Sequence, residues 1–213
     1  MGDMQTSVEY VSYGLHYIFY LSGGVQTAVI SHSQGGPNVQ WALQFWPSTR
    51  RITTSFVALS PDFAGIELLD SDLSAICVGD LCQASIWQQS AGSHYYDALH
   101  SENYSAQVPT TAIWSQSDSV VTPPQNNAAL PSATIISVQA LCPGRLVNHI
   151  FMTTDAAAFA IALDALEHAG IASLVRVLPQ VLDVCLRVNA KHMDIDLANQ
   201  LKGFFDDVVD GFM

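Results

Sequence analysis

Uncharged runs rich in β-branched residues alternate with helical segments along most of this 213-residue chain. The expected strands are 25–31, 52–60, 110–115 and 134–140, and the expected helices are 5–21, 38–45, 155–169 and, at the C-terminus, the amphipathic 195–212. Thr6 or Ser7 is the expected N-cap of the first helix, and Gly170 is expected to end the third. Because strands that alternate with helices favour a parallel sheet covered by helices, we expect one α/β domain over residues 1–213.

Charge and hydropathy exclude some classes of partner. Nineteen acidic residues against seven basic ones give a net charge of −12, whereas nucleic-acid binding needs a basic surface. The longest apolar run, 156–163, is much shorter than the ~20 residues that cross a bilayer, so we expect no transmembrane segment. Contact with a neutral lipid interface remains compatible with this composition. The first residues also lack the basic and apolar regions of a signal peptide.

The most informative local feature lies between the strand at 25–31 and the helix at 38–45. This junction reads Ser31-His32-Ser33-Gln34-Gly35-Gly36. A serine on a tight turn between a strand and a helix is typical of the nucleophile elbow of α/β-hydrolases. Such a turn exposes Ser33 Oγ at the sheet edge, and Gly35 lets the helix approach the strand closely. Since serine and glycine are common in turns, an ordinary turn is the alternative interpretation.

A serine nucleophile needs a base, and the base needs an acid to orient it. His149 is the candidate base, because it follows the strand at 134–140 on a loop at the carboxyl edge of the sheet. The histidines with less suitable positions are His16, His32, His94, His100, His168 and His192. Asp118 follows the strand at 110–115 and is the candidate acid, although aspartate also favours turns for structural reasons. The chain order of serine, acid and histidine is that of the α/β-hydrolases.

Several blocks resemble the signature blocks of the fungal lipase B family, the Candida antarctica lipase B-like serine lipases. They are SHSQGG at 31–36, PDFAG at 61–65, SIWQQ at 85–89 and VPTT at 108–111 continuing to Asp118, with a looser match at Asn148-His149. The blocks occur in family order over roughly residues 5–190. This resemblance implies an α/β-hydrolase fold and an ester hydrolase that needs no metal ion or cofactor.

The resemblance also implies roles for individual residues. It assigns the nucleophile, acid and base of an acyl-enzyme mechanism to Ser33, Asp118 and His149. The backbone N–H of Gln34 falls at the position of an oxyanion donor. The substrate-pocket positions are occupied by His32, Asp62, Ile66 and Gln89. The family has a tryptophan where this chain has His32, whose side chain we expect to point away from Ser33 Oγ and to line the pocket. For Asp62 and Gln89, hydrogen bonds to backbone groups are the expected main role.

The family further suggests a disulfide and a lid. Its bridge has a first cysteine at the place of Cys142, so we expect Cys142–Cys185, with Cys77–Cys82 as the remaining pair. Four free thiols in a cytosolic protein are the alternative. The even cysteine count, the few lysines and the acidic composition favour secretion. Residues 67–84 are a candidate lid, because they fall where the family places a lid-like helix.

One departure from the family affects the expected function. The residues before the strand at 25–31 are too few for the strands and the oxyanion loop that precede it in the family, so we expect an N-terminally shortened fold. The expected function is a carboxylic ester hydrolase of lipase or esterase type acting on a lipid or other ester. The alternative is a hydrolase-fold remnant that binds lipid or a partner without turnover. A peptidase or thioesterase on the same fold also stays open. The sequence does not indicate an oligomeric state.

Overall fold

A four-stranded parallel sheet forms the centre of the described part of the molecule. The computed structural model describes residues 2–67, 83–101, 103–193, 200 and 203. The strands are β1 (Thr27–His32), β2 (Thr53–Leu59), β3 (Thr110–Trp114) and β4 (Thr134–Ser137). They follow one another in the sheet in the order β1-β2-β3-β4, and each neighbouring pair is parallel. Parallel neighbours require crossover connections, which place helices on the faces of the sheet. The predicted α/β architecture is therefore confirmed.

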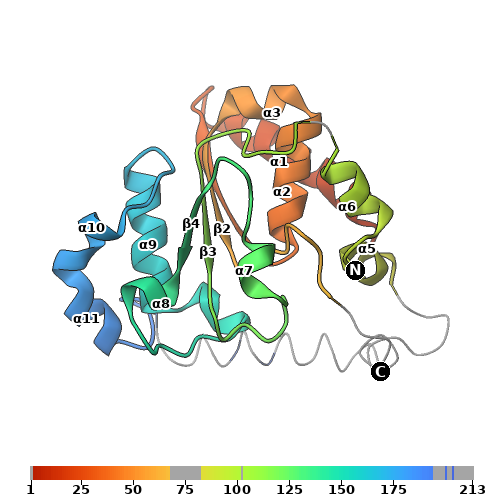
Figure 1. Ribbon diagram of the computed structural model, residues 1–213. Coiled ribbons are helices and arrows are strands. Elements are labelled where there is room, and N and C mark those ends of the chain that lie inside the picture. Colours follow the sequence, from red (N-terminus) through yellow and green to blue (C-terminus); the bar gives the residue numbers. More distant parts are fainter. Residues whose placement is uncertain (1, 68–82, 102, 194–199, 201–202, 204–213) are drawn as a thin grey trace.

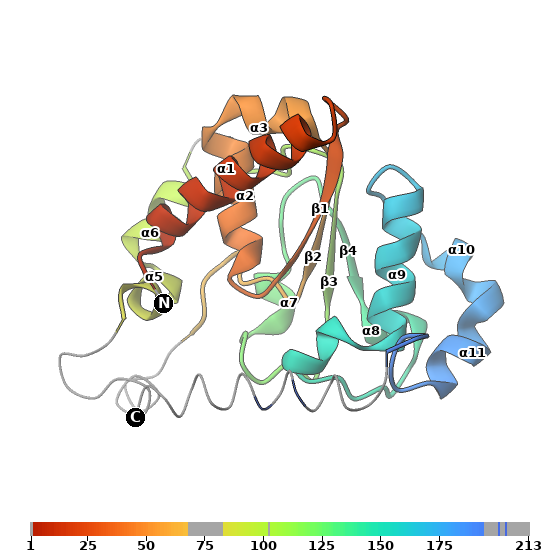
Figure 2. The ribbon, with the colours of Figure 1, turned by 180° about the vertical axis from the view of Figure 1, so that it is seen from behind.

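Helices cover both faces of this sheet (Figure 1 and, from behind, Figure 2). They are α1 (Met4–Leu21), α2 (Gly35–Phe45), α3 (Pro47–Ile52), α5 (Ala84–Gln89), α6 (His94–Leu99), α7 (Pro124–Asn127), α8 (Val138–Leu141), α9 (Ala156–Glu167), α10 (Leu174–Val177) and α11 (Val181–Leu186). Two short 3-10 turns span Ile150–Thr153 and Leu178–Gln180. Helix α2 packs on one face, with α1 outside it, and α9 packs on the other.

The central strand β2 supplies both layers of the core. Successive side chains of a strand point to opposite faces. Phe56 and Ala58 accordingly pack with Leu43 of α2, whereas Val57 packs with Ile161 of α9. All five side chains are fully buried. The absence of charge in this run, from which the strand was predicted, thus reflects burial on both sides.

Several predicted element ends differ from the observed ones, and two of the differences have a clear local cause. The strand expected at 134–140 ends at Ser137, because the Ser137 hydroxyl accepts a hydrogen bond from the backbone N–H three residues further on and begins α8. The first helix is capped by Asp3 rather than by Thr6 or Ser7. The Asp3 carboxylate accepts a hydrogen bond from the Thr6 N–H, as N-cap side chains do.

The C-cap of α9 is His168 rather than the predicted Gly170, but Gly170 fixes the position of the helix end on the sheet. Its N–H donates to the carbonyl of Ala165, at 2.7 Å. A Cβ added at Gly170 would lie 2.5 Å from Ser55 Cβ and 2.6 Å from the carbonyl oxygen of Pro109. Its φ of 87° is in the left-handed region that favours glycine. Only a residue without a side chain fits this close approach of the helix end to β2 and β3.

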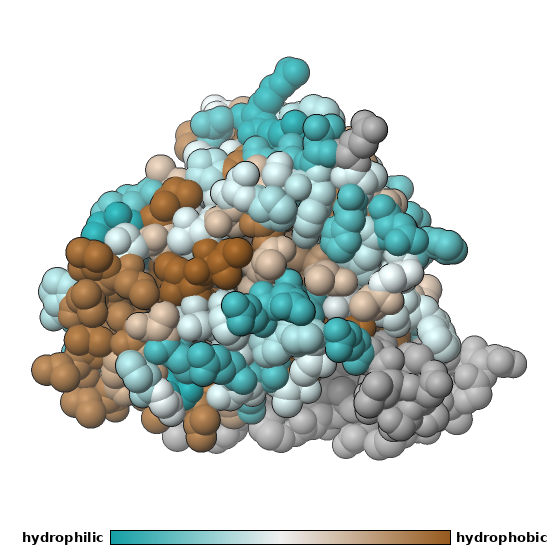
Figure 3. All heavy atoms as spheres, in the orientation of Figure 1, coloured by the Kyte–Doolittle hydropathy of each residue, from teal (hydrophilic) through white to brown (hydrophobic). Residues whose placement is uncertain are grey.

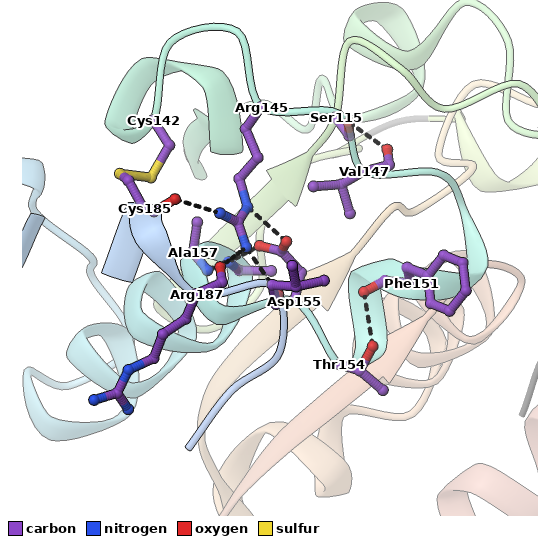
Figure 4. A network of polar contacts seen from close by, with 12 residues as sticks. Ser115, Cys142, Arg145, Val147, Phe151, Thr154, Asp155, Ala157, Cys185 and Arg187 are labelled. Atoms are coloured by element: carbon purple, nitrogen blue, oxygen red, sulfur yellow. Dashed lines mark hydrogen bonds and ion pairs between the residues drawn. A yellow bond between two sulfur atoms is a disulfide. The ribbon is translucent and has the colours of Figure 1, made fainter. Parts of the chain in front are cut away.

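A disulfide ties the loop after α8 to α11, and Arg145 of this loop binds both the start of α9 and the end of α11. The predicted Cys142–Cys185 disulfide is present, with the two Cα atoms 5.5 Å apart. Beside it, the Arg145 guanidinium donates to the Asp155 carboxylate at 2.6 Å and to the carbonyls of Cys185 and Arg187 at 3.2 and 2.6 Å (Figure 4). The segment that carries His149 is therefore anchored covalently and electrostatically at its start.

Some sequence predictions concern residues that lie outside the described ones. These are the candidate lid 67–84 apart from residues 67, 83 and 84, the Cys77–Cys82 pair, and the helix 195–212 apart from residues 200 and 203. Within the described part of the chain, no helix has the length and apolar character needed to cross a bilayer.

Candidate active site

Four polar residues follow the four strands at the carboxyl edge of the sheet. Ser33 comes directly after β1, Asp62 after β2, Asp118 after β3, and His149 after β4 and α8. Parallel strands end at the same edge, so residues far apart in the sequence meet there. His149, for example, contacts Ser33, which precedes it by 116 residues.

Ser33 lies on a strained turn between β1 and α2. Its φ is 55°, in the left-handed region that residues other than glycine rarely adopt. The Ser33 N–H donates to the carbonyl of Leu59 at 3.0 Å, and the Gly36 N–H donates to the carbonyl of Ser33 at 2.7 Å. A Cβ added at Gly36 would lie 2.6 Å from Pro61 Cβ, and one at Gly35 would lie 3.1 Å from a β1 side chain. The two glycines therefore allow a turn as sharp as a nucleophile elbow.

Ser33, His149 and Asp118 form a continuous hydrogen-bonded line. Ser33 Oγ lies 2.8 Å from His149 Nε2, and His149 Nδ1 lies 2.8 Å from Asp118 Oδ2. A carboxylate only accepts hydrogen bonds, so Nδ1 carries the proton and Nε2 of the neutral ring accepts from the serine hydroxyl. His149 and Asp118 are both buried. In this geometry the imidazole can take the serine proton while the carboxylate stabilises the resulting imidazolium.

The second oxygen of Asp118 explains why the carboxyl remains ionised. Asp118 Oδ1 accepts the backbone N–H groups of Val120 and Val121, both at 3.0 Å. Burial by itself raises the pKa of Asp118. The hydrogen bond and charge of His149, together with the two N–H groups, outweigh burial and hold this pKa below its usual value. Asp118 is therefore an anion that both orients His149 and stays charged at neutral pH.

Gln34, the predicted oxyanion donor, directly follows Ser33. It is the N-cap residue of α2, an 11-residue helix whose N-terminus favours negative charge. Among the described residues, its backbone N–H donates to no carbonyl. A helix N-terminal donor next to Ser33 can stabilise an anion that forms there.

Asp62 is fully buried beneath this edge. The hydroxyl of Tyr96 donates to its Oδ2 at 3.0 Å and to its carbonyl at 2.6 Å. A phenol is thus one partner of this carboxylate, beside the hydrogen bond from the Asp62 backbone that also lowers its pKa. Burial raises the pKa of Asp62 to about 6, against the lowering effect of the Tyr96 hydrogen bond and of the His149 charge. The influence of His149 indicates that Asp62 lies close to the candidate catalytic residues.

Comparison with known proteins gives the family. No protein-family model matches the chain. It is 31% identical over 174 residues to lipase B from Pseudozyma antarctica, a match that spans 78% of this chain and 50% of that protein. The crystal structure of Aspergillus fumigatus lipase B superposes with a TM-score of 0.88 at 33% identity, over 98% of this chain and 52% of that one. The chain belongs to the fungal lipase B family.

This membership confirms the family and the α/β-hydrolase fold that the sequence predicts. A Bacillus licheniformis lipase shares the fold at a TM-score of 0.50 and 15% identity, over 64% of this chain and 66% of that one. The chain spans about half the length of the two lipase B proteins it matches.

Gln89 and Ile66 lie side by side, as expected for residues of one pocket wall. The Ile66 N–H donates to the Gln89 carbonyl at 2.8 Å. The Gln89 amide donates to the carbonyl of Ser85 at 3.2 Å, which is the backbone role expected for it. That these residues and Asp62 line a substrate pocket stays a prediction.

His32, which stands where the lipase B family has tryptophan, lies against His149. Its Nε2 donates to the carbonyl of His149 at 2.9 Å, and the two ring centroids are 4.6 Å apart. Burial, followed by the charge of His149, lowers the pKa of His32 to about 4. His32 therefore stays neutral across the range in which a histidine base works. A pocket-lining role for its side chain stays a prediction.

Two residues that hydrogen-bond to the loop before His149 were not predicted from the sequence. Ser115 and Gln139 hydrogen-bond to carbonyls of the loop before His149. Ser115 follows β3 directly, in the block that also contains Asp118, and that position was the available signal. For Gln139 the sequence pattern gave no such indication, because its position in α8 decides which groups it contacts.

Proposed function

We propose that this chain is a carboxylic ester hydrolase of the lipase or esterase type. The observation that carries the proposal is the line from Ser33 Oγ through His149 to Asp118, with 2.8 Å at each step. Membership of the lipase B family supports it. The Cys142–Cys185 disulfide favours a secreted protein, since disulfides persist in oxidising compartments.

The proposed reaction has steps that this geometry supports. His149 Nε2 takes the proton of Ser33 as Oγ attacks the ester carbonyl carbon. The negative charge that develops on the carbonyl oxygen is stabilised by the N–H of Gln34 at the start of α2. His149 then gives the proton to the departing alcohol, which leaves Ser33 acylated. Water, deprotonated by the same His149, attacks the acyl group and restores the free enzyme, while Asp118 stays ionised throughout.

Hydrolysis of p-nitrophenyl esters of graded chain length tests this mechanism. Ser33→Ala and His149→Ala should each lose ~10⁴-fold or more in rate, and Asp118→Asn should lose less than either. Ser31→Ala is the matched control, because it removes a hydroxyl two residues from Ser33 that has no hydrogen-bond partner among the described residues. Full activity in Ser33→Ala would exclude Ser33 as the nucleophile.

Two alternatives are separated by further substrates. A remnant that binds lipid without turnover would not release p-nitrophenol. A peptidase or thioesterase would prefer p-nitroanilides or thioesters over oxygen esters of the same acyl group. The proposed esterase instead prefers oxygen esters.

We further propose that the protein contacts a lipid interface through the surface formed by α10 and α11. Figure 3 shows a continuous apolar area over these helices. Its most exposed members are Val175, Leu182, Leu186, Val188 and, on the neighbouring loop, Leu146. Exposed apolar patches of this kind mark binding surfaces, and a lipid phase matches their chemistry.

A further inference from the structure

Three backbone carbonyls in the loop that carries His149 accept hydrogen bonds from side chains. The pairs are Gln139 Nε2 to Arg145 O at 2.8 Å, Ser115 Oγ to Val147 O at 2.6 Å, and His32 Nε2 to His149 O at 2.9 Å. The accepting carbonyls belong to every second residue of the loop from Arg145 to His149. Figure 4 shows the middle pair beside the Arg145 network.

The three donors come from different elements of the sheet edge. Ser115 follows β3, Gln139 belongs to α8, and His32 ends β1. Gln139 also donates to Ser115 Oγ at 3.0 Å, which links two of the donors to each other. Ser115, Gln139 and His149 are all buried, so the loss of a donor leaves a carbonyl without its protein partner. The three hydrogen bonds thus hold the loop against the sheet edge, and His32 makes the one to His149 itself.

We propose that His32 is a positioning residue that holds His149 in line with Ser33 through the His149 carbonyl. This inference rests on the proposed function. His32 directly precedes Ser33, so its main chain carries the nucleophile while its ring holds the base. One residue therefore fixes both ends of the 2.8 Å contact between Ser33 Oγ and His149 Nε2. A misplacement of ~1 Å between such groups can cost ~10²-fold in rate.

The neutral state of His32 suits this role. A ring nitrogen that bonds a carbonyl must donate, so Nε2 carries the proton in the neutral tautomer. Because the pKa of His32 is lowered to about 4, chiefly by burial and then by His149, the ring adds no second positive charge when His149 becomes an imidazolium. The ring centroids lie 4.6 Å apart with planes tilted by 41°, which also limits rotation of His149.

The test compares His32→Gln with His32→Asn. The amide nitrogen of glutamine is as many bonds from Cβ as His Nε2, so it can reach the His149 carbonyl, whereas that of asparagine is one bond short. The readout is the rate at which a fluorophosphonate labels Ser33, because this step depends on proton removal by His149. We expect His32→Asn to label between ~10-fold and ~100-fold more slowly than wild type. His32→Gln should stay within about 3-fold of wild type.

A second readout reports the position of His149 without turnover. The His149 Nδ1 proton, held between the ring and Asp118, gives a downfield proton NMR resonance that should persist in His32→Gln and broaden or shift in His32→Asn. His16→Leu is the matched control, since it removes another ring-to-carbonyl bond, to Ser12 at 2.8 Å on α1. His32→Phe keeps the ring but not the donor, and replaces His32→Asn if that variant does not fold.

The outcomes separate the two proposals. If wild type is not labelled, the proposed function fails, and the resonance still decides the role of His32. If wild type is labelled and His32→Asn matches it in rate and in resonance, only the role of His32 is overturned. Equal losses in the glutamine and asparagine variants would also overturn it, because the hydrogen bond would then not be what holds His149.

Discussion

The buried carboxyl of Asp62 should make the stability of this protein depend on pH. Burial raises its pKa to about 6, from 3.8 in an exposed carboxyl. A carboxyl whose pKa is higher in the folded state binds its proton more tightly there. Its contribution to stability is therefore complete below pH ~4 and is lost as the pH rises through 6. A pKa difference of about 2, at ~1.36 kcal/mol per unit, corresponds to ~3 kcal/mol.

Asp62→Asn removes this dependence, because the amide does not ionise. One carboxylate oxygen has no partner among the described residues, so the new amide N–H₂ there costs ~1–3 kcal/mol at every pH. The change in unfolding free energy caused by the substitution should nevertheless differ by ~3 kcal/mol between pH 4 and pH 8, in favour of the variant at pH 8. Urea unfolding followed by tryptophan fluorescence at these pH values measures it.

Two further variants sharpen this experiment. Tyr96→Phe removes a hydrogen bond that lowers the pKa of Asp62, so the loss of stability should shift to higher pH and grow. Asp97→Asn is the matched control, because it also removes one carboxylate but at a side chain that is 66% exposed. If Asp62→Asn changes stability equally at pH 4 and pH 8, the assignment of a raised pKa to Asp62 is refuted.

Three other perturbations have expected outcomes. Replacing Cys142 and Cys185 by serine opens a loop of 43 residues and should lower the unfolding free energy by about 4 kcal/mol on the chain-entropy model, measured by urea unfolding; no change would contradict the role of the bridge. Arg145→Met leaves the buried Asp155 carboxylate and several carbonyls without their donor, so the unfolding free energy should fall by ~3–5 kcal/mol in the same assay. An unchanged unfolding free energy would refute the stabilising role of Arg145. Leu182→Asp with Leu186→Asp should reduce hydrolysis of emulsified triglyceride while leaving soluble short-chain esters unaffected, and equal loss on both substrates would argue against an interfacial role.

The sequence predicted the parts of the molecule that depend on local pattern. The β-branched runs identify the strands because both faces of the sheet are covered, and the turn at Ser33 is recognisable from its glycines. His149 could be chosen among seven histidines because chain order and the position after β4 place it at the carboxyl edge. The family resemblance supplied the cysteine pair that closes the loop before it.

What the sequence did not predict depends on contacts between distant residues. The hydrogen bond from His32 joins residues 117 positions apart in the sequence. Its acceptor is a backbone carbonyl, which every residue has, so the type of the accepting residue does not reveal it. The pairing of Tyr96 with Asp62 is equally non-local. The end of β4 at Ser137 was missed for a different reason. Its β-branched neighbours favour a strand, but the serine hydroxyl caps the following helix and ends the ladder.

The central claim, that Ser33 is a nucleophile activated by His149 and Asp118, is tested most directly by covalent labelling. Wild-type protein is treated with a fluorophosphonate at neutral pH, digested and analysed by mass spectrometry beside Ser33→Ala and His149→Ala. We expect a single adduct on the peptide containing Ser33 in wild type, none in Ser33→Ala, and labelling slowed by ~10⁴-fold or more in His149→Ala. An unlabelled wild type, or an adduct on another residue, would contradict the claim.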